Sequence, residues 1–286
     1  MKNVTWILAS VGMAFGAALL PSLGRSEVLF ADGFESGDFS HKQGGAAWTS
    51  MEKVTVVSSG AKSGKYAAKF HFPGNTDPTA DSWSELRFDS GKEVTEFWIQ
   101  YDLFIPTNFH HRTPSGPAND KFFRLWGNTY DDIEKVGAST FPNNGYSSMY
   151  GEWDDKVLGL KNGGGMTAYP PQTMNAITES DVGKWVTYKI FVKAATASSN
   201  ATLKIWKNGN LLLDDTNLIN DYTSGEMHTY RYGYILGWSN SGYDEDTDFL
   251  LDNVIMATQE SDLGASSSSP PAADGSIPNP PILTVK

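Results

Sequence analysis

The chain lacks cysteine entirely, and it is poor in basic residues. With no cysteine among 286 residues, its stability cannot come from disulfides. It has to come from a buried core, which a chain of this length can provide, or from a bound metal ion. The chain has 22 Lys and Arg against 33 Asp and Glu, for a net charge of −11. A chain this acidic is a poor binder of nucleic acid.

Long apolar runs are also missing, except at the N-terminus. Lys2 precedes an apolar stretch from Trp6 to Leu20, which ends in small residues before Arg25. This pattern predicts a signal peptide over residues 1–26 and a secreted or periplasmic bacterial protein. The stretch is short for a transmembrane helix, and the alternative is an uncleaved N-terminal anchor. Cleavage would change the net charge from −11 to −13, and we expect no membrane contact afterwards.

The composition changes again after Thr258. Residues 260–286 are rich in Ser and Pro, which is typical of a linker or disordered tail. We therefore expect one folded domain over residues 27–259, acting as a monomer.

Helical periodicity is nearly absent from this domain. Short runs of alternating apolar and polar residues are separated by Gly, Asn, Pro and Asp, which favours an all-β fold. Asn208 and Gly209 mark the turn of one hairpin. Many well-separated strands predict a jelly-roll sandwich of two antiparallel sheets.

Three strand-like segments combine an apolar face with an unusual polar face. In the first, Leu86 and Phe88 alternate with Trp83, Glu85 and Arg87. An aromatic ring, a carboxylate and a guanidinium in a row can stack on a sugar and hold its hydroxyl or carboxylate groups.

The other two segments repeat the pattern. Strict alternation over residues 121–127 places Phe122, Arg124 and Trp126 on one face, and over residues 94–106 it places Gln100 beside Trp98. Solvated sheet faces rarely carry so many large aromatics, because these promote association. We therefore predict one sugar-binding face with Arg87 and Arg124 together and Trp83, Gln100 and Trp126 beside them.

Four segments resemble the concanavalin-like jelly-roll polysaccharide lyases, which include heparin lyase I, glucuronan lyase and alginate lyases. The matching segments are Asp32–Phe39, Ser84–Arg87, Trp98–Pro106, and Gly183–Tyr188 with Lys204–Gly209. The chain departs from the family where some members carry a Gln-x-His, because Arg124-Leu125-Trp126 stands there instead. In a late strand, some family members have a Lys-x-Gly-x-Tyr pattern. Arg231-Tyr232-Gly233-Tyr234 is similar to it, but its residues are offset from the positions in that pattern.

The resemblance implies β-elimination on an anionic, uronate-containing polysaccharide. This reaction needs a group that neutralises the sugar carboxylate, a base for the proton next to it, and an acid for the departing oxygen. Arg87 and Arg124 suit the first role, and a tyrosine beside two arginines suits the others. The candidates are Tyr150 and Tyr232 for catalysis, with Tyr146 and Tyr234 as substrate-binding neighbours.

The sequence predicts two further features besides the arginines and tyrosines: a histidine pair near the sugar-binding face and a calcium site. His110 and His111 follow the Ile-Pro segment and could border the sugar-binding face. Glu35, near the first strand, and Asp252, in the last, could hold a structural calcium ion that joins the two ends of the domain; the acidic run 244–248 is the alternative. No organic cofactor is implied.

Two other functions are compatible with these residues. The missing Gln-x-His favours a non-catalytic carbohydrate-binding domain of lectin type. Glu152 and Asp154 share a strand face as in retaining glucanases of the same fold, although Val157 replaces the third acid, so a glycoside hydrolase is a weaker alternative. The paired arginines favour the lyase.

Overall fold

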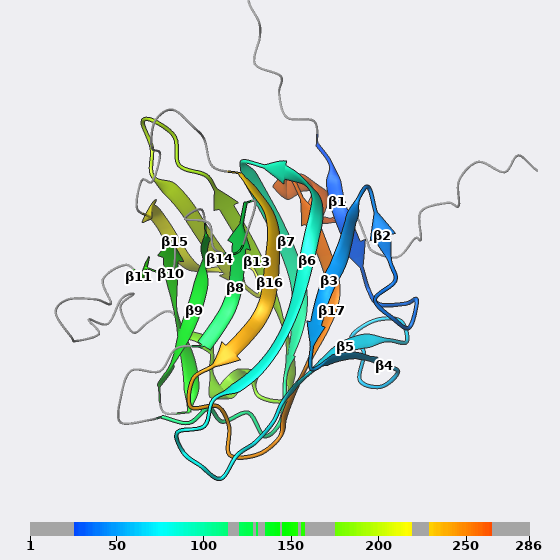
Figure 1. The fold of residues 1–286 in the computed structure, drawn as a ribbon, viewed down its shortest axis with the longest axis vertical. Coiled ribbons are helices and arrows are strands. Elements are labelled where there is room, and N and C mark those ends of the chain that lie inside the picture. The colour runs from blue at the N-terminus through cyan, green and yellow to red at the C-terminus, as the bar shows by residue number, and fades with distance from the viewer. Residues whose placement is uncertain are drawn as a thin grey trace, which may run out of the picture.

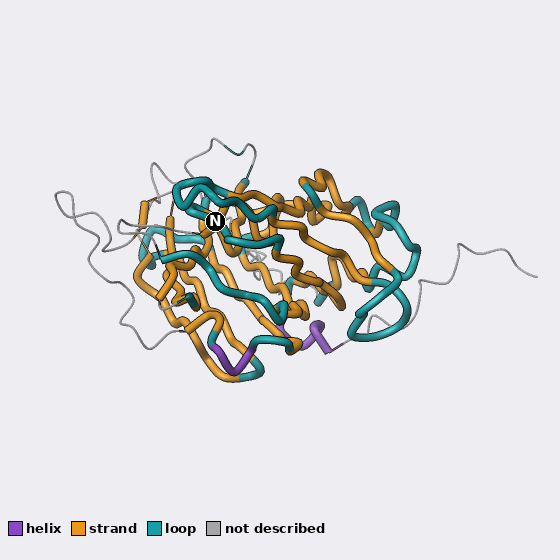
Figure 2. The backbone as a smooth tube through the Cα atoms, turned by 90° about the horizontal axis from the view of Figure 1, so that it is seen from below, coloured by secondary structure: helices purple, strands orange, loops and turns teal. Residues whose placement is uncertain are grey.

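The computed structural model describes residues 26–113, 120–127, 130, 135–143, 145–153, 156–157, 175–218 and 229–264. Nearly all of the predicted signal peptide and of the C-terminal tail lies outside these ranges, so export remains a prediction. No helix among the described residues is long and apolar enough to cross a membrane. Strands dominate, and the two helical segments of the described chain are the short 3₁₀ turns η1 (Glu179–Asp181) and η2 (Glu260–Gly264) (Figure 2).

The strands form two antiparallel sheets, as the alternation predicts. Sheet A has the order β15 (Asn210–Leu218), β14 (Ala201–Lys207), β13 (Lys184–Lys193), β7 (Glu96–Ile105), β17 (Thr247–Ala257), β5 (Ala67–Phe72) and β4 (Val54–Val57), with β1 (Val28–Asp32) also paired to β17. Sheet B has the order β11 (Lys156–Val157), β10 (Tyr146–Trp153), β9 (Val136–Asn143), β8 (Asp120–Trp126), β16 (Tyr230–Ser239), β6 (Ser82–Val94), β3 (Ala46–Glu52) and β2 (Lys42–Gln43), with β12 (Asn175–Ile177) paired to β10.

The two sheets pack face to face over one large apolar core. In Figure 1, β6, β16 and β8 lie side by side in one layer, with β7 and β13 in the other. Leu86 and Phe88 of β6 are at most 1% exposed, and the Phe88 ring stacks on Phe97 of β7 at 6.0 Å between centroids. Each such buried side chain contributes about 1.5–3 kcal/mol to folding. We call the face of sheet B that points away from this core its outer face.

The hairpin predicted at Asn208 and Gly209 is confirmed. β14 and β15 pair antiparallel around these two residues, whose φ angles are 49° and 80°. Positive φ at both central positions is the signature of a type I′ turn, which matches the twist of the flanking strands. Asn and Gly are favoured there because they adopt this backbone conformation at low cost.

Two sequence-based expectations about the strands are wrong. Phe122 packs in the core, with its ring 5.0 Å from that of Tyr188, because a register shift between Lys121 and Phe123 turns both phenylalanines inward. Such a bulge breaks the two-residue alternation. Gln100 lies on β7, which belongs to sheet A. The chain passes from sheet B to sheet A at Thr95, the one residue that separates β6 from β7.

The ordered chain also continues past the predicted boundary at Gln259. Leu263 of η2 is 5% exposed and packs with Ile255 and Ala257 of β17. This apolar contact holds the beginning of the predicted tail against the domain.

Candidate active site

Arg87 and Arg124 lie on one face of sheet B, as predicted, with a tyrosine between them. Tyr234 of β16 is directly opposite Arg87 of β6 on one side and Arg124 of β8 on the other. Directly opposite residues share a face, with Cβ atoms about 4.5–5.5 Å apart. The neighbouring residues Leu86, Ile235 and Leu125 belong to the core, so the row Arg87–Tyr234–Arg124 is on the outer face.

Aromatic rings surround this row. The Trp126 ring lies 5.9 Å from Tyr234, 6.4 Å from Tyr232 and 5.2 Å from Tyr130, measured between centroids. Tyr130 also lies 6.4 Å from Tyr234, which is 1% exposed. The sequence did not indicate Tyr130, because strand alternation says nothing about a residue in a turn.

Positive charge is concentrated around the same rings. The Arg87 guanidinium lies 5.1 Å from the Tyr130 centroid and 5.8 Å from the Trp126 ring. The Lys135 ammonium, which the sequence also did not indicate, is 4.7 Å from Tyr130. These are cation–π distances. Basic side chains therefore gather around these rings, with Glu85 paired to Arg87, although the chain as a whole is acidic.

The two arginines differ in accessibility. The Arg87 side chain is 33% exposed and its Nε donates a 2.5 Å hydrogen bond to Oε1 of Glu85, whose own side chain is 7% exposed. Arg124 has no exposed surface. Arg87 can thus meet a ligand directly, whereas Arg124 contributes its charge from beneath the surface.

The tyrosines of β10 lie farther away. Met149 and Gly151 face the core, so Tyr150 is on the outer face, where its ring stacks on Phe141 at 6.1 Å. Its strand is two places from that of Arg124, which separates the backbones by about 10 Å. Tyr146, at the start of the strand, packs partly against the core. Neither is adjacent to Arg87.

The two histidines take different positions. His111 is fully buried; its Nε2 is 3.0 Å from Asp120 and 2.9 Å from the Ser239 hydroxyl, and its Nδ1 is 2.6 Å from the Arg112 carbonyl. Burial acts to lower the pKa of His111, but the charge and hydrogen bond of Asp120 outweigh it and raise the pKa above its usual value. The prediction that His111 binds substrate is wrong, because both ring nitrogens are used internally. His110 is exposed, and its ring lies against Gly145.

Trp83 is on the outer face, at the end of β6. It is opposite Trp238 of β16, and their rings are 5.8 Å apart. A two-residue alternation along β16 would place Trp238 on the same face as Tyr232 and Tyr234, but this alternation is interrupted at Leu236, which has a φ of 55° and packs in the core. Gln100, by contrast, lies in the other sheet, and the prediction that it flanks the arginines is wrong.

Glu35 and Asp252 converge on one loop, residues 62–66. Asp252 accepts hydrogen bonds from the backbone N–H groups of Lys62 at 2.9 Å and Ser63 at 3.0 Å, and Glu35 accepts from those of Lys65 and Tyr66. Burial raises the pKa of Asp252 against the effect of these donors.

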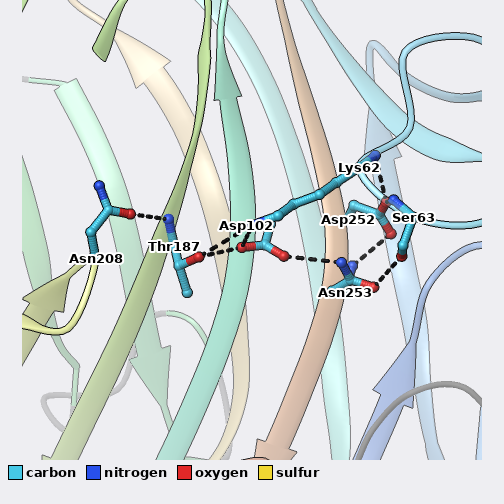
Figure 3. A network of polar contacts seen from close by, with 7 residues as sticks. All are labelled: Lys62, Ser63, Asp102, Thr187, Asn208, Asp252 and Asn253. Atoms are coloured by element: carbon cyan, nitrogen blue, oxygen red, sulfur yellow. Dashed lines mark hydrogen bonds and ion pairs between the residues drawn. The ribbon is translucent and has the colours of Figure 1, made fainter. Parts of the chain in front are cut away.

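Lys62 extends this network across sheet A. Figure 3 shows its ammonium reaching Asp102, 2.8 Å away, while the Asn253 amide donates to the other oxygen of Asp102. The described part of the chain brings no group of three or more His, Cys, Asp or Glu side chains together. A calcium ion at Glu35 and Asp252 would therefore take its remaining oxygen ligands from carbonyls and water, and would displace some of the N–H donors.

Comparison with known proteins gives a family for this arrangement. The family model "Polysaccharide lyase" matches residues 34–250. No curated protein sequence matches the chain.

Solved structures share the fold at low sequence identity. One is an alginate lyase, Aly36B, in a variant complexed with an alginate trisaccharide; it is 12% identical, with a TM-score of 0.52 over 79% of this chain and 96% of that one. Another is the alginate lyase vAL-1 from a Chlorella virus, 12% identical, with a TM-score of 0.52 over 76% of this chain and 94% of that one. A third is an endo-β-1,4-glucuronan lyase from the fungus Trichoderma reesei, 14% identical, with a TM-score of 0.49 over 85% of this chain and the whole of that one.

Proposed function

Since the chain belongs to the polysaccharide lyase family, we propose that it cleaves a uronate-containing, anionic glycan by β-elimination on the outer face of sheet B. The observation that carries this proposal is the row Arg87–Tyr234–Arg124, in which one tyrosine stands directly opposite an arginine on each neighbouring strand. Arg87, whose side chain is 33% exposed, offers a positive charge to an anionic chain in spite of the overall charge of −11.

Arg87 is the proposed carboxylate-binding group. It is partly exposed, and a guanidinium binds a carboxylate through two parallel hydrogen bonds. This contact withdraws negative charge from the sugar carboxylate, so the proton on the adjacent carbon becomes more acidic. The bond to Glu85 and the Tyr130 ring hold the guanidinium in place.

Tyr234 is the proposed base. The charges of Arg87 and Arg124 favour a phenolate and so oppose the desolvation of Tyr234, which is 1% exposed and whose burial by itself disfavours the charged form. The phenolate takes the proton from the carbon next to the carboxylate, the freed electron pair forms a carbon–carbon double bond, and the bond to the glycosidic oxygen breaks. The leaving oxygen then takes a proton, either from the tyrosine or from water. Since Tyr234 is 1% exposed, the side chains around it, among them the Tyr130 ring at 6.4 Å, have to move before substrate can reach its hydroxyl.

Tyr232 and Tyr150 are weaker candidates for this role. Tyr232 is opposite Asp89 of β6, so it has a carboxylate at the position where Tyr234 has Arg87. Tyr150 is two strands away from Arg124. Tyr232 instead offers partly exposed aromatic surface beside the reacting sugar, whereas Trp126 is 5% exposed and packs against Tyr232 and Tyr234.

The test is a panel of purified polyuronates and neutral glycans, followed by the ultraviolet absorbance of the unsaturated product end. We expect absorbance to rise with at least one polyuronate and with none of the neutral glycans. Binding of a polyuronate without any unsaturated product would instead favour the carbohydrate-binding domain. New reducing ends without ultraviolet absorbance would favour the glycoside hydrolase.

We also propose the structural calcium ion at Glu35 and Asp252. A cation that binds only the folded state stabilises it by about 2.7 kcal/mol at 100 times its Kd, so chelation is expected to lower the melting temperature by about 5–10 °C. The Glu35→Gln variant should lose this sensitivity to chelator. An unchanged melting temperature, with no metal in elemental analysis, would show that the hydrogen bonds to loop 62–66 close the domain without an ion.

A further inference from the structure

We propose that Trp83 and Trp238 form a stacking platform for a second part of the glycan, so that the enzyme prefers long chains to short oligosaccharides. This inference rests on the proposed function, because it concerns the same substrate on the same face of sheet B. The contact chemistry differs: the platform takes the apolar face of a sugar ring, whereas Arg87 takes a carboxylate.

The two tryptophans are placed for binding rather than for core packing. Trp238 is 43% exposed, which makes it one of three large apolar side chains exposed in the described part of the chain. Neither Trp83 nor Trp238 belongs to the apolar core of the described residues. Exposed aromatic surface of this size on a soluble domain marks a binding site more often than it serves the fold.

Hydrogen bonds hold the exposed ring in one orientation. The Trp238 Nε1–H donates to Oδ2 of Asp81 at 3.0 Å, and the other oxygen of Asp81 accepts from the backbone N–H of Ser241 at 2.8 Å. The Trp83 ring packs beside it, with 5.8 Å between centroids and an angle of 43°. A ring fixed before binding loses little conformational entropy when a ligand stacks on it.

The platform is too far from the reaction site to bind the same sugar. Trp83, Glu85 and Arg87 alternate along β6, so Trp83 is four residues from Arg87, or about 13 Å along the strand. That distance exceeds the span of one sugar ring. A ligand that reaches both must therefore be a chain.

Between Tyr234 and Trp238, β16 presents no bulky side chain on the outer face, because Ile235 and Leu236, the latter with a positive φ of 55°, both pack in the core. Gly237 precedes Trp238, and a Cβ atom there would lie 3.0 Å from Cβ of Lys121 and 3.1 Å from Oε2 of Glu85. Because Gly237 has no side chain, nothing projects from the strand at this position, and Lys121 and Glu85 lie next to it. A glycan chain can thus run along the strands from Arg87 to the tryptophans over polar groups suited to its hydroxyls.

The test compares Trp238→Ala and Trp83→Ala with Leu211→Ala, which removes a side chain that is 51% exposed on the other sheet. KM and kcat are measured on a polyuronate and on the shortest oligosaccharide that is cleaved. Loss of one stacking contact is expected to raise KM for the polymer about tenfold. The effect on the shortest oligosaccharide should be several-fold smaller, and Leu211→Ala should resemble the parent protein.

The outcomes of this test distinguish failure of the platform from failure of the proposed function. Equal effects on polymer and oligosaccharide, or a polymer KM like that of Leu211→Ala, would overturn the platform while leaving the lyase chemistry in place. If the parent protein forms no unsaturated product, the proposed function fails, and titration of intrinsic fluorescence with the polyuronate then decides the platform. Weaker polymer binding in Trp238→Ala than in Leu211→Ala would support it, and equal binding would refute it.

Discussion

Replacing Tyr234 by Phe is expected to lower the turnover of a polyuronate by about 100- to 10,000-fold, the contribution typical of a positioned general base. The substitution removes the hydroxyl and keeps the ring that packs against Trp126 and Tyr130. Steady-state kinetics by product absorbance measures the effect, and circular dichroism with thermal melting confirms that the variant folds. KM should change much less than kcat, because the ring contacts remain.

Tyr232→Phe is the matched control. It removes the same atom from the next outer-face position of β16, beside the same Trp126 ring but opposite Asp89 rather than an arginine. We expect this variant to keep most of its activity. If Tyr232→Phe loses turnover and Tyr234→Phe does not, the base is Tyr232 and the position between the arginines is not what activates it.

Removing the charge of Arg87 is expected to cost at least about 100-fold in turnover of an anionic glycan, because the sugar carboxylate is no longer neutralised. Arg87→Met alone is a poor test, since it leaves the buried Glu85 carboxylate without its partner and so destabilises the fold. The informative comparison is the double variant Arg87→Met, Glu85→Gln against Glu85→Gln alone. Turnover measured on the same polyuronate gives the loss due to the guanidinium.

Arg87→Lys adds a second measurement. It keeps the positive charge but loses the two parallel hydrogen bonds, so its turnover should fall between those of Glu85→Gln and the double variant. If the double variant matches Glu85→Gln, Arg87 does not bind the carboxylate. Substitution of the fully buried Arg124 is a poorer test, because removing so large a buried side chain affects stability as well as charge.

Much of the candidate site follows from local patterns in the sequence. Two-residue alternation assigns Arg87 to the face opposite Leu86 and Phe88, and Arg124 to the face opposite Leu125, and both assignments are confirmed. The hairpin at Asn208 and Gly209 follows from the φ angles that its turn requires. These features depend only on residues a few positions apart, so they can be read without knowledge of the fold.

Local patterns fail wherever the chain departs from regularity. Phe122 was assigned to the polar face, and the bulge beside Lys121 turns it into the core. Tyr130 and Lys135, which surround the arginine row, were not found at all, since no strand pattern extends to them.

The sequence by itself determined the class of fold, the side of the regular strand segments that faces the core, and the pairing of aromatic rings with arginines on the opposite side. Only the tertiary structure decided which strands are neighbours. β16 inserts between β6 and β8, which brings Tyr234 between two arginines from far earlier in the chain, while β7, only one residue after β6, joins the other sheet and takes Gln100 with it. The physical reason is that alternation is set by adjacent residues along one strand, whereas strand order depends on how all the apolar faces of the chain are buried together.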